Sequence, residues 1–243
     1  MPWVSLYWIF GLVTIVMIII IGITRLPRVK LMESERIGAT ETHKTLLANR
    51  QVWLFFLGIF CYVGTEQGLA DWISKFLSDY HGFNSQTTGA SAVSYFWGLL
   101  TVGCFLGMLL LKFIDSRKIL ITFVLAAMVC LTLGLFGPAQ VSLWAFPAAG
   151  FCLSVMWSIV FSLALNSIDK HHGAFSGILC TAIIGGAIVP LMIGWFGDYA
   201  GLRYSMLILY LTLGYILSIG FWARPIIVNA TVSFKKKMKN ESK

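Results

Sequence analysis

Two acidic residues, Glu66 and Asp71, lie inside one long apolar stretch, where an isolated charge is costly. A charged group at the centre of a bilayer costs roughly 2.5 to 3.5 kcal/mol on insertion scales, so it usually faces a cavity or a partner. Counted from Val52, Glu66 lies about 21 Å along a helix and Asp71 about 28 Å. Loss of water favours the neutral carboxyl group, so Glu66 could take up and release a proton. A plain hydrogen bond from Glu66 to a neighbouring helix is the alternative.

The residues beside these two carboxyl groups predict different roles for them. Asp71 lies four residues before Lys75, and an i, i+4 ion pair at a helix end explains Asp71 most simply. Glu66 has no such local partner, and Gly64 and Gly68 on either side of it predict a helix that loosens there. Interrupted helices of this kind form substrate sites in secondary transporters. We therefore expect Glu66 to contact a proton or a substrate.

Polar and aromatic side chains in other apolar stretches could complete a ligand site. Within residues 143–166 a polar residue recurs at every fourth position beside Trp157, and Asn166 is the one best suited to contact a ligand. Serines in membrane helices often donate to their own i−4 carbonyl groups, so a structural role is the alternative. Tyr95 and Trp97 offer stacking surfaces to a polyol, or else pack and anchor the helix. The candidate proton- or substrate-binding residues are Glu66, Gln67, Tyr62, Tyr95, Trp97, Trp157 and Asn166.

Patterns typical of enzymes and metal sites are absent from the sequence. His171 and His172 are adjacent and lack a carboxylate pair, and no GxSxG, HExxH or P-loop motif occurs. All five cysteines fall inside apolar stretches without a CxxC pair, so we interpret them as reduced packing residues. We therefore expect no enzymatic activity, no catalytic residues, no metal and no cofactor.

The composition requires a membrane to position these residues. Hydrophobic residues make up 58% of the 243 and charged residues only 12%, and the mean hydropathy is +0.83. A soluble domain carries about a quarter of its residues as charged ones. Uninterrupted apolar runs of bilayer length predict an all-α, polytopic membrane helix bundle of seven transmembrane helices. The predicted segments are residues 5–24, 52–73, 88–111, 119–136, 143–166, 175–196 and 204–222.

The net charge of +8 indicates a membrane topology rather than a nucleic-acid partner. Of the 18 Lys and Arg residues, only Lys75 and Arg203 fall on one set of alternate connections, and all the others fall on the opposite set. The positive-inside rule then predicts an N-terminus outside the cell and a cytoplasmic C-terminus. The longest connection, residues 25–51, mixes both charge signs, and the basic tail could contact anionic lipid.

Several local motifs together resemble one family of transporters. The residues that carry the resemblance are 62–66 with Trp72, 96–107, 115–118, and 185–190 with Gly194 and Asp198. These resemble, in that order, the seventh helix, the eighth helix, an Asp-Arg-rich loop and the eleventh helix of the fucose/galactose/hexose proton symporters. That family, which includes the L-fucose permease type, is a sugar branch of the major facilitator superfamily. One departure is Cys104, because the family's pattern often has an Arg there, beside the glutamate.

The resemblance corresponds only to helices six to twelve, and so implies a missing N-terminal half that holds helices one to five. It implies that residues 1–24 are the sixth helix, 25–51 a cytoplasmic linker between halves, 52–228 the six-helix C-terminal half, and 229–243 a basic cytoplasmic tail. The implied function is proton-coupled uptake of a monosaccharide by alternating access, in a bacterial inner membrane. The sugar, the proton, the lipid bilayer and the missing half are the expected partners.

Two other classes of membrane protein stay open at this point. A seven-helix receptor has the same number of spans and the same orientation. The last segment, however, lacks a Lys for a retinal Schiff base, and the outer connections lack a cysteine pair. A non-transporting subunit or a remnant would bind no hexose.

Overall fold

The computed structural model describes residues 2–24, 39–223 and 225–226, and these residues form helices and no strands. The all-α prediction is therefore confirmed. The chain divides into two units, Met1–Ile37 and Gly38–Lys243. The first unit contains the apolar helix α1 (Pro2–Ile23). Most of the predicted linker (25–38) and the predicted basic tail lie outside the described residues.

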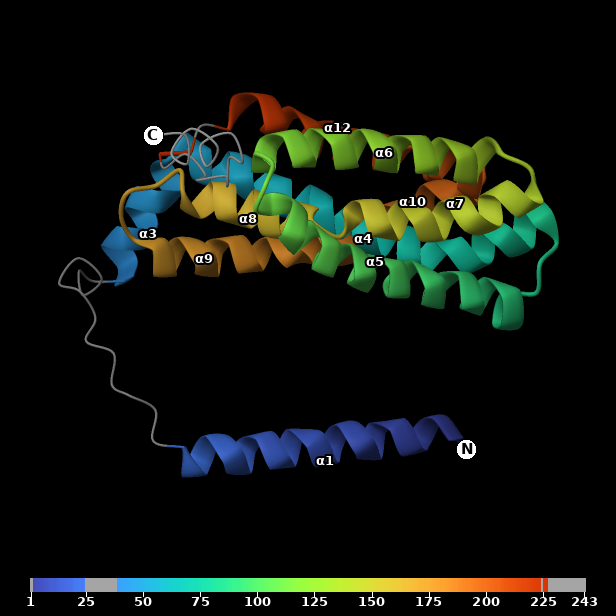
Figure 1. Ribbon diagram of the computed structural model, residues 1–243, viewed down its shortest axis with the longest axis horizontal. Helices are drawn as coiled ribbons and strands as arrows, with labels where there is room; N and C mark the ends of the chain where they lie inside the picture. Colours follow the sequence, from blue (N-terminus) through green and yellow to red (C-terminus); the bar gives the residue numbers. More distant parts are fainter. Residues whose placement is uncertain (1, 25–38, 224, 227–243) are drawn as a thin grey trace, which may run out of the picture. The chain divides into compact units, whose positions relative to one another are not determined.

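The second unit is a bundle of long apolar helices, some of them interrupted (Figure 1). Six stretches within the described residues are long and apolar enough to cross a membrane. The predicted segment 5–24 coincides with α1, in which the apolar stretch Tyr7–Ile23 is shorter than these six. The elements are α3 (Ala39–Ala48), α4 (Arg50–His81), the π-helical turn η1 (Ser85–Gly89), α5 (Ala90–Leu111), α6 (Ser116–Phe136), α7 (Ala139–Leu153), α8 (Met156–Leu165), α9 (His172–Thr181), the 3-10 turn η2 (Ala182–Ile184), α10 (Gly185–Ala200), α11 (Leu202–Ser205) and α12 (Ile208–Trp222).

Helix α4 is the longest element, with 32 residues, and it packs against most of the others. It begins where the Asn49 side chain accepts a hydrogen bond from the backbone N–H of Gln51 at 2.9 Å. It ends at Gly82, whose φ of 70° is readily adopted by glycine. At about 48 Å the helix is longer than a bilayer core is thick.

The outer end of α4 corrects one sequence prediction. The apolar run stops at Ile73, but the helix continues to His81. Lys75 pairs with Asp79 at 2.7 Å, one turn further on, so the predicted pair between Lys75 and Asp71 is wrong. The pairing follows from the longer helix, because both partners lie on its exposed side and can remain in contact with water.

The glycines of α4 correct a second prediction, because the helix runs without a break through Gly64 and Gly68. Both glycines instead let α10 approach closely. A β-carbon on Gly64 would lie 2.9 Å from Cβ of Val189, and one on Gly68 would lie 3.0 Å from Cδ1 of Ile193. These residues, with Gly185, Gly186 and Gly194 on the facing side, form what we call the α4–α10 interface.

Breaks in the helical ladder occur elsewhere in the bundle. The predicted segment 143–166 is divided between α7 and α8 at Ser154 and Val155. The segment 175–196 is divided at η2, before Pro190 in α10. Gly103 and Gly107 of α5 pack against the α7–α8 break, as expected for a GxxxG pair, because β-carbons there would overlap Ser154 and Val155. Helices α6 and α12 lie side by side at one edge of the unit (Figure 1).

Candidate functional site

Glu66 and Tyr62 lie one turn apart on the same face of α4. The Tyr62 side chain is 3% exposed, Glu66 is half-buried, and the tyrosine hydroxyl lies near the carboxyl group. Trp157 of α8 packs against Tyr62, with ring centroids 5.9 Å apart and planes inclined by 54°. Trp157 also stacks on Phe161 of its own helix, at 5.7 Å and 19°. The structure therefore brings Tyr62, Glu66 and Trp157 together.

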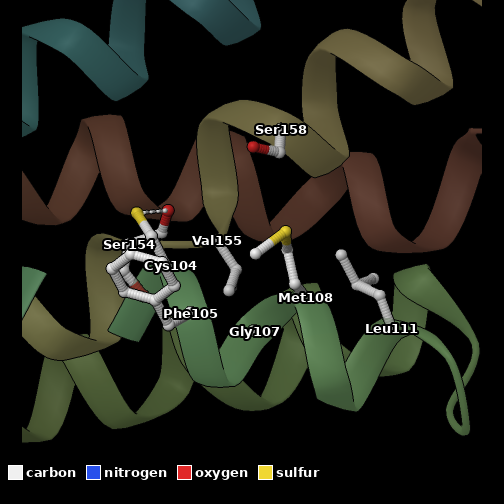
Figure 2. A pocket seen from close by; sticks show the side chains of 8 residues that line it. All are labelled: Cys104, Phe105, Gly107, Met108, Leu111, Ser154, Val155 and Ser158. Carbon is white, nitrogen blue, oxygen red and sulfur yellow. Dashed lines mark hydrogen bonds between the residues drawn. The ribbon is translucent and has the colours of Figure 1, made fainter. Parts of the chain in front are cut away.

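Cys104 of α5 also lies beside Tyr62 and Glu66. It lies close enough to interact electrostatically with both Glu66 and Tyr62. Its thiol donates to the carbonyl oxygen of Ser154 at 3.3 Å, across the α7–α8 break. A cavity of about 230 Å³ opens here (Figure 2). Its lining residues are Cys104, Phe105, Gly107, Met108, Leu111, Ser154, Val155 and Ser158.

The carboxyl group of Glu66 has no basic partner among the residues the structure describes. The two ion pairs found there join Lys75 to Asp79 and Arg117 to Asp115. The thiol of Cys104 stands where a guanidinium would be expected from the resemblance. A carboxyl group in this setting has one hydroxyl neighbour, Tyr62, and it can exchange between neutral and charged forms without first breaking an ion pair.

Gln67 lies beside this group but faces a different neighbour. A β-carbon on Gly186 would lie 3.0 Å from Cγ of Gln67. The side chain therefore lies at the α4–α10 interface, about a quarter-turn from Glu66. Gln67 is half-buried, like Glu66.

The other three candidate residues lie farther along their helices. Tyr95 is 54% exposed and stacks on Trp144 of α7 at 5.8 Å and 24°, about 13 Å along α5 from Cys104. Trp97 is 36% exposed and meets Phe96 edge to face at 5.4 Å. Asn166 follows the last residue of α8, about 13 Å beyond Trp157. Its backbone oxygen accepts a hydrogen bond from the Ile226 N–H at 2.8 Å.

A buried pair of threonines beside Glu66 was not anticipated. Thr65 is fully buried, and its hydroxyl lies 2.6 Å from that of Thr212 in α12. The Thr65 hydroxyl also lies 2.8 Å from the carbonyl oxygen of Cys61 in α4. The Thr212 hydroxyl lies 2.9 Å from the carbonyl oxygen of Leu209 in α12. The two protons cannot serve all three contacts, so one threonine donates to the other and forgoes its own carbonyl. Threonines in two apolar segments were the only signal in the sequence.

Residues 1–183 match the sequence pattern of the Major Facilitator Superfamily. The chain belongs to this superfamily. The glucose/galactose transporter of Brucella abortus is 34% identical over 216 residues, which are 88% of this chain and 52% of that protein. The L-fucose-proton symporter of Escherichia coli is 24% identical over 202 residues, or 80% of this chain and 45% of that protein. The predicted family resemblance is thus confirmed.

The facilitator fold is confirmed by a solved structure. The crystal structure of the Escherichia coli fucose:proton symporter superposes with a TM-score of 0.76 at 21% identity, covering 90% of this chain and 54% of that one. The chain spans about half the length of the curated relatives it matches. As a member of this superfamily it is a multi-pass membrane protein of a transporter family rather than of an enzyme family. No group of three or more potential metal ligands occurs among the described residues.

Proposed function

We propose that this chain is the C-terminal portion of a proton-coupled monosaccharide symporter of the fucose/hexose type, which works by alternating access. The observation that carries this proposal is Glu66, a half-buried carboxyl group without a basic partner, beside Tyr62 and Trp157. The names of the relatives, a glucose/galactose transporter and an L-fucose-proton symporter, support the choice of substrate.

Glu66 is the proposed proton carrier. When water reaches the site the carboxylate is stabilised by solvent and by the Tyr62 hydroxyl, which can donate to it. When water is excluded, the charged form loses most of that stabilisation, and uptake of a proton restores a neutral group. Closure of the site would thereby be coupled to proton binding.

The sugar would occupy the space in front of the same residues. An aromatic face such as that of Trp157 suits the C–H face of a pyranose, while the Gln67 amide can donate to and accept from hydroxyl groups. The cavity beside Cys104 lies next to this position. Tyr95, Trp97 and Asn166 remain predicted contacts, and they would bind a sugar at another stage of its passage.

The site would be completed by the N-terminal half, of which helices one to five are the expected partner of this chain. Substrate sites in this class of transporter lie between two halves near the middle of the membrane. The distribution of Lys and Arg supports an N-terminus outside and a C-terminus in the cytoplasm, in a bacterial inner membrane. A seven-helix receptor is not favoured, because the relatives are transporters.

Uptake by a reassembled transporter tests the proposal. The chain would be co-expressed with the first five helices of the Brucella abortus glucose/galactose transporter in cells that lack hexose and fucose uptake. We expect uptake of labelled galactose, glucose or fucose driven by an inward pH gradient. Glu66→Gln should abolish gradient-driven uptake while sparing counterflow exchange, because a permanently neutral side chain cannot release a proton.

Asp71→Asn is the matched control, since it neutralises an exposed carboxylate on the same helix. It should transport like the unmodified chain. Normal gradient-driven uptake by Glu66→Gln would refute the proton role. If tryptophan fluorescence of the purified chain and the reassembled pair both show no binding of any hexose, a non-transporting remnant is the better description.

A further inference from the structure

Two basic side chains meet at the end of the bundle where α4 stops. His81 is the last residue of the span Arg50–His81, and Arg203 is the second residue of the span Leu202–Trp222. The Arg203 guanidinium lies over the Tyr80 ring, 4.5 Å from its centroid, and its backbone N–H donates to the Tyr80 hydroxyl at 3.1 Å. Residues at the ends of membrane spans lie at the level of the lipid headgroups. Both basic side chains therefore lie at that level.

Both side chains carry a buried nitrogen without a partner. Nε of Arg203 and Nε2 of His81 are inaccessible to solvent and make no hydrogen bond. The nearby carboxylate of Asp79 is held by Lys75, and neither ion pair of the described residues includes Arg203. The two groups are close enough for the charge of Arg203 to act on His81. Arg203 is half-buried and pairs with no carboxylate in either ion pair of the described residues, so its guanidinium can donate to an anion from outside the chain.

An apolar groove lies at the same end of the bundle as Arg203. It has a volume of about 210 Å³ and lies between α10, α11 and α12. Tyr204 and Ser205, which line the groove, are the two residues that follow Arg203 in the four-residue helix α11. From there the groove extends to Ile208 and to Phe196, one turn or more farther into their spans. Its lining residues are Phe196, Ala200, Tyr204, Ser205 and Ile208.

We propose that this end of the bundle binds one anionic phospholipid, with its phosphate at Arg203 and His81 and an acyl chain in the groove. The charge is complementary, because arginine binds phosphate oxygens with strong charge-assisted hydrogen bonds. The depth also fits, because both basic side chains lie at headgroup level and the groove leads toward the hydrocarbon core. The proposal is independent of sugar transport.

Native mass spectrometry of the full chain in detergent measures the binding. The chain is titrated with phosphatidylglycerol or with phosphatidylcholine of the same acyl chains. We expect one molecule of phosphatidylglycerol to be retained in preference to phosphatidylcholine. Arg203→Gln should weaken that binding about fivefold, the effect of one basic residue near a charged membrane surface. His81→Gln should weaken it as well, while Lys75→Gln, which removes a cation already paired with Asp79, should not.

Two further variants separate the possible outcomes. Arg203→Lys keeps the positive charge and should keep most of the preference, which distinguishes lost binding from lost folding. Ile208→Trp fills the groove and leaves Arg203 and His81 unchanged, so it should weaken lipid binding. If inorganic phosphate displaces the lipid and Ile208→Trp has no effect, the site binds a free anion and the lipid proposal is wrong. Equal retention of the two lipids, or unchanged binding by Arg203→Gln, would also overturn it.

Discussion

The α4–α10 interface predicts a large cost for adding a single methyl group at Gly185. A β-carbon at this position would overlap the carbonyl oxygen of Phe60 and would lie 2.8 Å from its carbonyl carbon and 2.9 Å from its α-carbon. Ordinary contacts are 3.4 Å or longer. All three atoms belong to the backbone of α4, so no side-chain rotation can make room and the two helices must separate.

The size of the effect follows from that geometry. Overpacking by one methyl group typically costs about 1 to 3 kcal/mol, and rigid backbone neighbours place Gly185→Ala toward the upper end. Gly177→Ala in α9 is the matched control, because no atom lies within 4 Å of its β-carbon position. There the change should be neutral or stabilising by up to about 1 kcal/mol, the difference in helix propensity between glycine and alanine.

Unfolding of the purified chain by titration with SDS, followed by circular dichroism, measures both variants. We expect Gly185→Ala to unfold at a distinctly lower SDS fraction than the unmodified chain, and Gly177→Ala at the same fraction or a higher one. If the two alanine variants have equal free energies of unfolding, close approach at Gly185 does not hold α4 against α10. A gain in stability from Gly185→Ala would contradict the described packing altogether.

Three other expectations follow from contacts of α4 and from the break between α7 and α8. In a double-mutant cycle of Thr65→Val and Thr212→Val, SDS unfolding should give a coupling of about 0.6 kcal/mol, the average for hydrogen bonds between membrane helices, and additive effects would exclude a shared hydrogen bond. Trp72→Phe should cost about 0.5 to 1.5 kcal/mol, because the indole N–H donates to the Pro190 carbonyl at 3.1 Å. Trp195→Phe, at a side chain that is 58% exposed, should cost much less. Amide hydrogens of residues 154–156 should exchange with deuterium faster than those of 64–68, because the series of helical backbone hydrogen bonds is interrupted at 154–155 and continuous through 64–68. Equal protection of the two segments would argue against a break.

The extent of the membrane helices could be predicted only as far as hydropathy reports it. The seven apolar runs locate the spans, because lipid selects for apolar residues along the whole crossing. Residues 74–81 do not belong to such a run, since they include Lys75 and Asp79, yet α4 continues through them. Helix formation depends on the backbone and on capping, and the first residue that ends it is Gly82 with its positive φ. Hydropathy therefore gave too short a helix and the wrong partner for Lys75.

The local role of a glycine could not be read from one helix. Gly64 and Gly68 are compatible with a loosened helix and equally with a close helix contact. The residues that decide are Val189 and Ile193, more than a hundred positions away in the chain. The spacing of Tyr62 and Glu66 does place them on one face from sequence alone. That Trp157 and Cys104 lie beside them depends on how α8 and α5 pack against α4.

The contacts of α4 indicate which part of the bundle can move to open a path to Glu66. On one side α4 is held to α10 through glycines and to α12 through Thr65 and Thr212, and these contacts leave no room for sliding. On the other side α5 packs on the α7–α8 break through Gly103 and Gly107, next to a cavity. A break with adjacent empty space can bend at less cost than a continuous, close-packed helix. We therefore expect α4, α10 and α12 to remain fixed and the α5 side to move when the carboxyl group becomes accessible.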